Sequence, residues 1–146
     1  MEINVKVLNE KARIPVYSSD GAACFDFFAP NGGMVSSYHP AVIETGLAFD
    51  IPTGNCMLIF SRSGDGFKQD VRLSNCVGVI DSDYTGEVKI KLTKDSYGAK
   101  LFNAGDRVAQ GLIIPVNQVT FNVVEQLKET ERGDGGFGST GSWEAL

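Results

Sequence analysis

Two carboxylates and a phenol lie close together near the middle of the 146-residue chain, in the segment Asp81-Ser82-Asp83-Tyr84. A carboxylate can act as a general base, but spacing alone does not choose between Asp81 and Asp83, because residues two apart share one face of a strand. The apolar run Cys76–Ile80 precedes this segment, and the strand-like run Glu87–Leu92 follows it. We therefore predict a β-hairpin with the acidic segment at its tip. On this stretch alone, an acidic turn in solvent is the commoner explanation.

A second group of residues that could do chemistry lies in a glycine-rich C-terminal segment. Five glycines occur between residues 133 and 141, together with Arg132, Phe137, Ser139 and Thr140. Glycines let backbone N–H groups approach phosphate oxygens, hydroxyls donate hydrogen bonds to them, and an arginine pairs with them. No Gly-Lys-Ser/Thr follows, so this is not a Walker loop. On composition alone a mobile tail is the commoner explanation, and we predict a core domain over residues 1–128 and an arm over 129–146.

Short strands are the elements expected to position these groups. Apolar alternation and turn residues predict strands at 3–8, 23–29, 41–51 (a pair broken at Thr45-Gly46), 56–60, 76–80, 87–92 and 107–116. Residues 30–40 are expected to form a loop, and Phe121–Leu127 a last strand or a short helix. No convincing three-turn helix stands out, and 17 glycines and nine phenylalanines favour an all-β fold.

Composition limits the classes of function. A net charge of −5 without a long basic run argues against a nucleic-acid partner. No apolar window is long enough to span a membrane, and no signal peptide is visible, so we expect a cytoplasmic protein. The three cysteines, Cys24, Cys56 and Cys76, are expected to be reduced core thiols. The single histidine, His39, makes a zinc site or a Ser-His triad improbable.

One further acid, Asp26, lies inside the otherwise apolar run 23–29. A buried carboxylate needs a partner. From the residues alone it is either a strand-edge group that caps a loop or a charge aimed at a functional site.

Five segments, in order, resemble the motifs of the trimeric dUTPase family. They read ACFDFFA at 23–29, SRSG at 61–64, NCVGVIDSDYTGE at 75–87, GDRVAQ at 105–110 and RGDGGFGSTG at 132–141. They span nearly the whole chain, and the third and fifth are highly specific. The resemblance implies an all-β jelly roll, or distorted β-barrel, that assembles as a threefold homotrimer. Its flexible C-terminal arm would close over a neighbouring subunit's active site.

The implied reaction is the hydrolysis of dUTP to dUMP and pyrophosphate, which limits uracil incorporation into DNA and supplies dUMP for dTMP synthesis. By resemblance, Asp81 is the general base that activates water for attack at the α-phosphorus, and Tyr84 stacks on the deoxyribose. The remaining implied substrate contacts are Asn75, Gly78, Val79, Ile80 and Lys89 near the uracil, Arg62, Ser63, Gly64 and Gln110 at the phosphates, and Arg132, Phe137, Gly138, Ser139 and Thr140 from the arm. Mg²⁺ would be chelated by the triphosphate, without a direct protein ligand, and Asp26 would reach its waters or pair with an arginine.

The chain departs from the family pattern at Ser61, Cys24, Gly111 and Asp65. Asp65 is the most consequential, because a carboxylate beside a phosphate loop should repel substrate. We expect it to point to solvent or to pair with a lysine such as Lys68.

Three alternatives stay open, one of them another enzyme and two of them from non-enzymatic classes. A dCTP deaminase-like enzyme would share the fold and release ammonia. A regulatory binding protein could use the same scaffold, with residues 30–40 and 142–146 as the partner surface. A purely structural jelly-roll module would hydrolyse no nucleotide.

Overall fold

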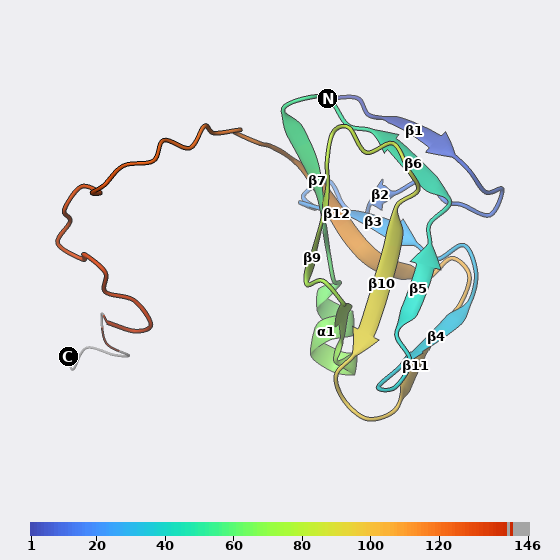
Figure 1. The fold of residues 1–146 in the computed structure, drawn as a ribbon. Helices are drawn as coiled ribbons and strands as arrows, with labels where there is room; N and C mark the ends of the chain where they lie inside the picture. Colours follow the sequence, from blue (N-terminus) through green and yellow to red (C-terminus); the bar gives the residue numbers. More distant parts are fainter. Residues whose placement is uncertain (140, 142–146) are drawn as a thin grey trace.

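The computed structural model describes residues 1–139 and 141, and it is built almost entirely of short antiparallel strands (Figure 1). The largest sheet has five strands in the order β2-β3-β12-β7-β9. Its strands are β2 (Val16–Tyr17), β3 (Phe25–Phe28), β12 (Arg107–Pro115), β7 (Asn55–Phe60) and β9 (Val77–Ile80). This confirms the prediction of an all-β fold.

Three smaller sheets complete the body. They consist of β5 (Ala41–Glu44), β10 (Lys89–Lys94) and β8 (Val71–Leu73), of β1 (Asn4–Val7) with β6 (Leu47–Asp50), and of β4 (Gly33–Ser36) with β11 (Ala99–Phe102). The expected 30–40 loop was therefore wrong in part, because it contains β4. The predicted pair within 41–51 is present as two strands, but β5 pairs with β10 and β6 pairs with β1.

Apolar side chains from several sheets meet in one core. Phe27, Leu47, Met57 and Ile90 are almost completely buried, and they come from four different strands. Alternation explains why β10 and β5 each bury every second residue. Because these short strands cannot bury a face alone, packing between sheets is what stabilises them.

The predicted hairpin is wrong as a pair of hydrogen-bonded strands. β9 pairs with β7, whereas β10 pairs with β5 and β8, so the two strands belong to different sheets. The segment 81–88 therefore crosses from one sheet to the other. β9 lies at the edge of its sheet, which leaves its outer N–H and C=O groups unpaired by any strand of the described chain.

One short helix, α1 (Ser63–Gln69), follows β7 in the part that the sequence suggested would be a loop (Figure 1). Arg62 is its N-cap residue and has extended backbone geometry. The helix ends at Asp70, whose left-handed backbone (φ 52°) turns the chain into β8.

After Pro115 the chain leaves the body and runs outward (Figure 1). The expected strand or helix at Phe121–Leu127 is absent, because no neighbouring strand is available there. Its apolar side chains are exposed, including Phe121, Val123 and Leu127. Exposed apolar side chains clustered in this way are typical of a surface that binds another surface.

The expectation of three core thiols was wrong for two of them. All three cysteines are free, and Cys56 is buried, but Cys24 is only partly buried and Cys76 is exposed. Cys76 adopts a left-handed backbone conformation (φ 63°) in the tight turn that leads into β9, where Val77 N donates to Asn75 O at 2.7 Å. This turn exposes the Cys76 side chain, although the residue belongs to an apolar run in the sequence.

Candidate active site

Residues of the stretch 75–89 line two adjoining cavities. The first, of about 260 Å³, is lined by Val79, Ile80, Asp81, Tyr84, Glu87, Val88 and Lys89. The second, of about 290 Å³, shares Val79, Ile80 and Lys89 and adds residues that include Asn75 and Gly78. The structure thus brings together all seven predicted residues of this region, and we call this pair of cavities the hairpin pocket.

Glycines let the backbone and a ring approach closely in the hairpin pocket. A Cβ atom at Gly78 would lie 3.3 Å from Cβ of Ile59 on the paired strand. A Cβ atom at Gly86 would lie 2.7 Å from the hydroxyl oxygen of Tyr84. The Tyr84 hydroxyl instead donates to the carbonyl of Glu87 at 2.9 Å, which folds the phenol ring over the crossing segment.

Lys89 is held at the mouth of the hairpin pocket by two acids. Its Nζ lies 2.6 Å from Oε1 of Glu44 and 3.7 Å from Oε2 of Glu87. The hydrogen bond and the negative charge of Glu44 raise the pKa of Lys89, and Glu87 adds a smaller contribution. Both Asp81 and Asp83 are exposed, so Asp81 is accessible to water and to a ligand.

A second group of charges surrounds Arg62, at the start of α1. Asp26 is buried and forms ion pairs on both sides, with Oδ1 lying 3.5 Å from Nε of Arg62 and Oδ2 3.3 Å from Nε of Arg107. The prediction that Asp26 pairs with an arginine is therefore confirmed. We call Arg62, Arg107, Lys100, Asp26 and Asp65 the Arg62 cluster.

A polar cavity of about 390 Å³ opens beside the Arg62 cluster. Arg62, Arg107 and Lys100 line it together with Arg13, whose guanidinium carbon lies 4.0 Å from the centre of the Phe28 ring. The sequence analysis missed Arg13, Lys100 and Arg107 as neighbours of Arg62. Only Arg107 carried a signal, because it lies in the GDRVAQ motif.

Gln110 and Ser61 join β12 to the end of β7. The Gln110 amide donates to the carbonyl of Ser61 at 3.0 Å, and the Ser61 hydroxyl accepts from the backbone N–H of Leu73 at 2.8 Å. Ser61 therefore has a structural role in this chain. Ser63 and Gly64 are exposed in the first turn of α1, beside Arg62.

Two other departures from the family pattern also have local explanations. Gly111 allows Phe25 and Phe27 to pack against β12, because a Cβ atom there would lie 2.8 Å and 2.9 Å from their rings. Burial and the negative charge of Asp26 raise the pKa of the Cys24 thiol. This thiol is thus held in its neutral, less nucleophilic form.

The hairpin pocket and the cavity at the Arg62 cluster share no lining residue. The arm residues Arg132, Phe137, Gly138 and Ser139 line neither of them, and Thr140 lies outside the described residues. Arg132 donates to the carbonyl of Gly135 at 2.8 Å, within the arm itself. One chain thus presents the predicted site residues as three separate groups.

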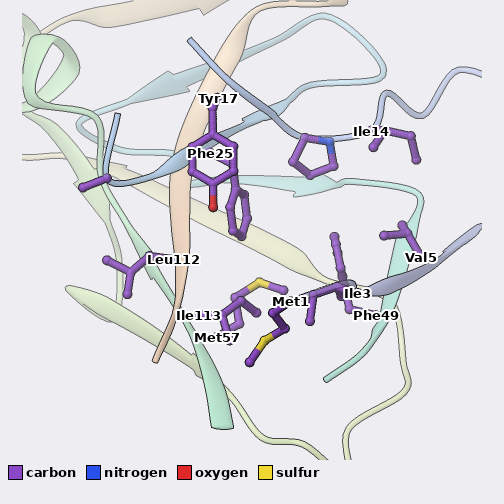
Figure 2. Close-up of a pocket in the computed structure, with 12 residues that line it drawn as sticks. Met1, Ile3, Val5, Ile14, Tyr17, Phe25, Phe49, Met57, Leu112 and Ile113 are labelled. Atoms are coloured by element: carbon purple, nitrogen blue, oxygen red, sulfur yellow. The ribbon is translucent and has the colours of Figure 1, made fainter. Parts of the chain in front are cut away.

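An apolar cavity of about 560 Å³ lies on another part of the body (Figure 2). Met1, Ile3, Phe49, Met57 and Ile113 point into the same space in Figure 2. Its lining residues carry no charged side chain, so it offers nothing to a phosphate.

Comparison with known proteins identifies the class. The family model for dUTPase matches residues 10–141. A deoxyuridine 5'-triphosphate nucleotidohydrolase of Nautilia profundicola is 43% identical over 141 residues, which cover 97% of this chain and 99% of that protein. One of Hydrogenobaculum sp. is 38% identical with the same coverage. The chain therefore belongs to the dUTPase family.

Solved structures agree. A mutant dUTPase of Staphylococcus bacteriophage 80alpha, in complex with dUpNHpp, superimposes with a TM-score of 0.88 at 28% identity, over 96% of this chain and 98% of that one. A mutant dUTPase of phage phi11 of S. aureus, which coordinates a structural Mg(II) ion, gives a TM-score of 0.79 at 26% identity, over 86% and 98%. The resemblance seen in the five motifs is confirmed.

Proposed function

We propose that this enzyme hydrolyses dUTP to dUMP and pyrophosphate, with the hairpin pocket as the nucleoside site. The observation that carries the proposal is the pocket itself. It places an accessible carboxylate, Asp81, beside a phenol ring, Tyr84, and an unpaired strand edge, β9. Membership of the dUTPase family supports the same substrate.

The free edge of β9 supports recognition of uracil. Uracil presents an acceptor at O4 and a donor at N3, so backbone N–H and C=O groups from Gly78 to Ile80 complement it. Cytosine reverses this pattern and would leave buried groups unpaired. Tyr84 would lie against the deoxyribose and leave no room for a 2′-hydroxyl, while Asn75 and Lys89 close the pocket from the two sides.

Asp81 acts on water in this proposal. Its carboxylate accepts a proton from a water molecule, whose oxygen attacks the α-phosphorus. The bond from that phosphorus to the bridging oxygen breaks, and pyrophosphate leaves. An ordinary carboxylate is a weak base, so positioning of the water supplies more of the rate than basicity.

We assign the triphosphate to Arg62, Ser63, Gly64 and Gln110, with Mg²⁺ chelated by the substrate. Among the described residues, no group of three His, Cys, Asp or Glu side chains lies close enough to hold a metal ion. Both oxygens of Asp26 already face arginines. Contact through water therefore fits this chain better than direct coordination. The ion would supply charge neutralisation of the phosphates.

A homotrimer would unite the three separate groups. The segment that leads to the arm carries exposed apolar side chains from Val119 to Leu127, and the body carries an apolar cavity (Figure 2). Docking of this segment on a neighbouring body would bury both. It would also carry Arg132, Phe137, Gly138, Ser139 and Thr140 to a neighbour's site, with Phe137 over the uracil and the others at the phosphates.

The test is pyrophosphate and ammonia release from dUTP and dCTP. We expect pyrophosphate from dUTP and neither product from dCTP at a comparable rate. Ammonia from dCTP would indicate the deaminase alternative. Absence of both products from both nucleotides would leave a binding protein or a structural module, and the proposed function would be wrong.

A further inference from the structure

Asp65 was expected to point to solvent or to pair with a lysine such as Lys68. It does pair with a lysine, but that lysine is Lys100. Asp65 is only 8% exposed, and one carboxylate oxygen, Oδ1, accepts from Nζ of Lys100 on β11. Lys100 lies 35 residues further along the chain, in a strand paired with β4. The two side chains are 12% and 20% exposed, so this is a largely buried ion pair.

The second oxygen of Asp65 has no hydrogen-bond partner. Oδ2 is buried and lies 4.0 Å from Nη1 of Arg62, which is too long for a hydrogen bond. Arg62 is instead engaged by Asp26 at Nε and by the carbonyl of Arg107 at Nη1. Asp65 is therefore poised to draw Arg62 toward itself, and what restrains it is its pairing with Lys100.

Charge balance gives this pairing a consequence for substrate. The Arg62 cluster holds three cations and two carboxylates, so it carries one net positive charge. Without the charge of Lys100 the cluster would be neutral, and Asp65 would be a buried carboxylate whose nearest cation is Arg62. Leaving a buried charge uncompensated is strongly unfavourable, so Arg62 would be captured.

We propose that Lys100 is a positioning residue, which neutralises Asp65 and so leaves Arg62 free and the Arg62 cluster positive toward the triphosphate. This inference rests on the proposed function in assigning a phosphate to Arg62. The same pair explains how a carboxylate is tolerated within three residues of that arginine. Lys100 acts through Arg62 and is not proposed to touch the reacting atoms.

The test is Lys100→Gln, because an amide still donates a hydrogen bond to Asp65 while the charge is lost. KM for dUTP should rise about tenfold, with kcat changed less than threefold. Asp65→Asn removes the opposite charge and should lower KM about threefold. The double variant Asp65→Asn/Lys100→Gln restores one net positive charge and should return KM to within threefold of the wild type.

Lys94 provides a matched control. It is a second buried lysine, 7% exposed, and its Nζ donates to the carbonyl of Gln69 at the other end of α1 and to Ser96. Lys94→Gln should lower the melting temperature as Lys100→Gln does, and leave KM unchanged. If the Lys100–Asp65 pair had only a structural role, both lysine variants would have a lower melting temperature and an unchanged KM.

The inference is overturned if Lys100→Gln changes KM by less than threefold, or if Asp65→Asn raises KM as Lys100→Gln does. Should Lys100→Gln not fold, the sign of the Asp65→Asn effect still decides. Wild-type enzyme that releases no pyrophosphate from dUTP would instead overturn the proposed function. Calorimetric binding of inorganic pyrophosphate to the wild type and to Lys100→Gln would then test the pair alone, with weaker binding by the variant expected.

Discussion

The hairpin pocket and the Arg62 cluster are built in opposite ways. Most of the hairpin pocket comes from one continuous stretch, residues 75–89, whose members are neighbours in the sequence. The Arg62 cluster gathers side chains from three strands (β3, β11 and β12), from the N-cap of α1 and from α1 itself. The first can be inferred from a motif, whereas the second depends on which strands the fold places side by side.

The two regions also treat charge differently. In the hairpin pocket Asp81 is exposed, and Lys89 meets its acids at the surface. In the Arg62 cluster two carboxylates are buried and each is paired. Removing one member of an exposed ion pair has a small effect on stability. Removing one member of a buried ion pair leaves the other charge buried, and that charge must pair with another group.

The largest expected effect comes from Asp81→Asn. Loss of the carboxylate should lower kcat about a thousandfold. Binding of dUTP should stay nearly intact, because the asparagine side chain has almost the same size and shape as the aspartate. Pyrophosphate release measures it. The matched control is Asp83→Asn, two residues away in the same exposed turn. Equal losses in both variants would mean that the motif does not single out Asp81.

Truncation after Glu131 tests whether the glycine-rich arm belongs to the site. We expect about a hundredfold loss of kcat/KM, because Arg132 and Phe137 are removed, with the melting temperature changed little since these residues bury nothing on their own body. Sedimentation should show an unchanged assembly, because the apolar segment 119–127 is kept. Full activity in the truncated chain would remove the arm from the mechanism.

Gly111→Ala is expected to act on stability more than on turnover. The added methyl group would lie within 3 Å of both Phe25 and Phe27, which cannot move without disturbing the core. Overpacking of this kind costs about 1–3 kcal/mol of unfolding free energy. Chemical denaturation measures it. An unchanged free energy of unfolding would show that the rings rearrange freely.

The smallest effect is expected from Glu44→Gln, at the exposed ion pair with Lys89. The glutamate raises the pKa of Lys89, so its contribution to stability is present below about pH 10 and is lost as the pH rises through the raised pKa. The melting temperature of the variant should lie slightly below that of the wild type at pH 8 and should equal it at pH 12. A difference that persisted at pH 12 would contradict this origin.

The sequence predicted the features that depend on neighbouring residues and missed those that depend on which strands the fold brings together. Motif order identified the family and the acidic segment, because both depend on local residue types. For Asp26 it left open metal-bound waters or an arginine, and the fold brings Arg62 and Arg107 to it. It could not assign β9 and β10 to different sheets, since both have ordinary strand composition. For Asp65 it offered solvent or a lysine, with Lys68 as the example near in sequence, whereas Lys100 is brought near by the pairing of β11 with β4.

The segment from Phe121 to Leu127 was expected to be regular structure for the same reason. Its phenylalanine and valines are typical of a strand. A strand needs a partner, however, and none lies beside this segment in the described chain. Residue types show that a segment can form a strand, but the presence of a neighbouring strand decides whether it does.

We propose that no single chain builds the whole site. This proposal is tested by mixing two inactive variants, Asp81→Asn and Arg62→Ala, unfolding and refolding them together, and measuring pyrophosphate release from dUTP. If the hairpin pocket and the Arg62 cluster come from different subunits, some sites in mixed trimers hold both intact parts, and activity should recover to about a quarter of the wild-type value in an equal mixture. A mixture as inactive as its components would show that both parts act within one chain and would contradict the account.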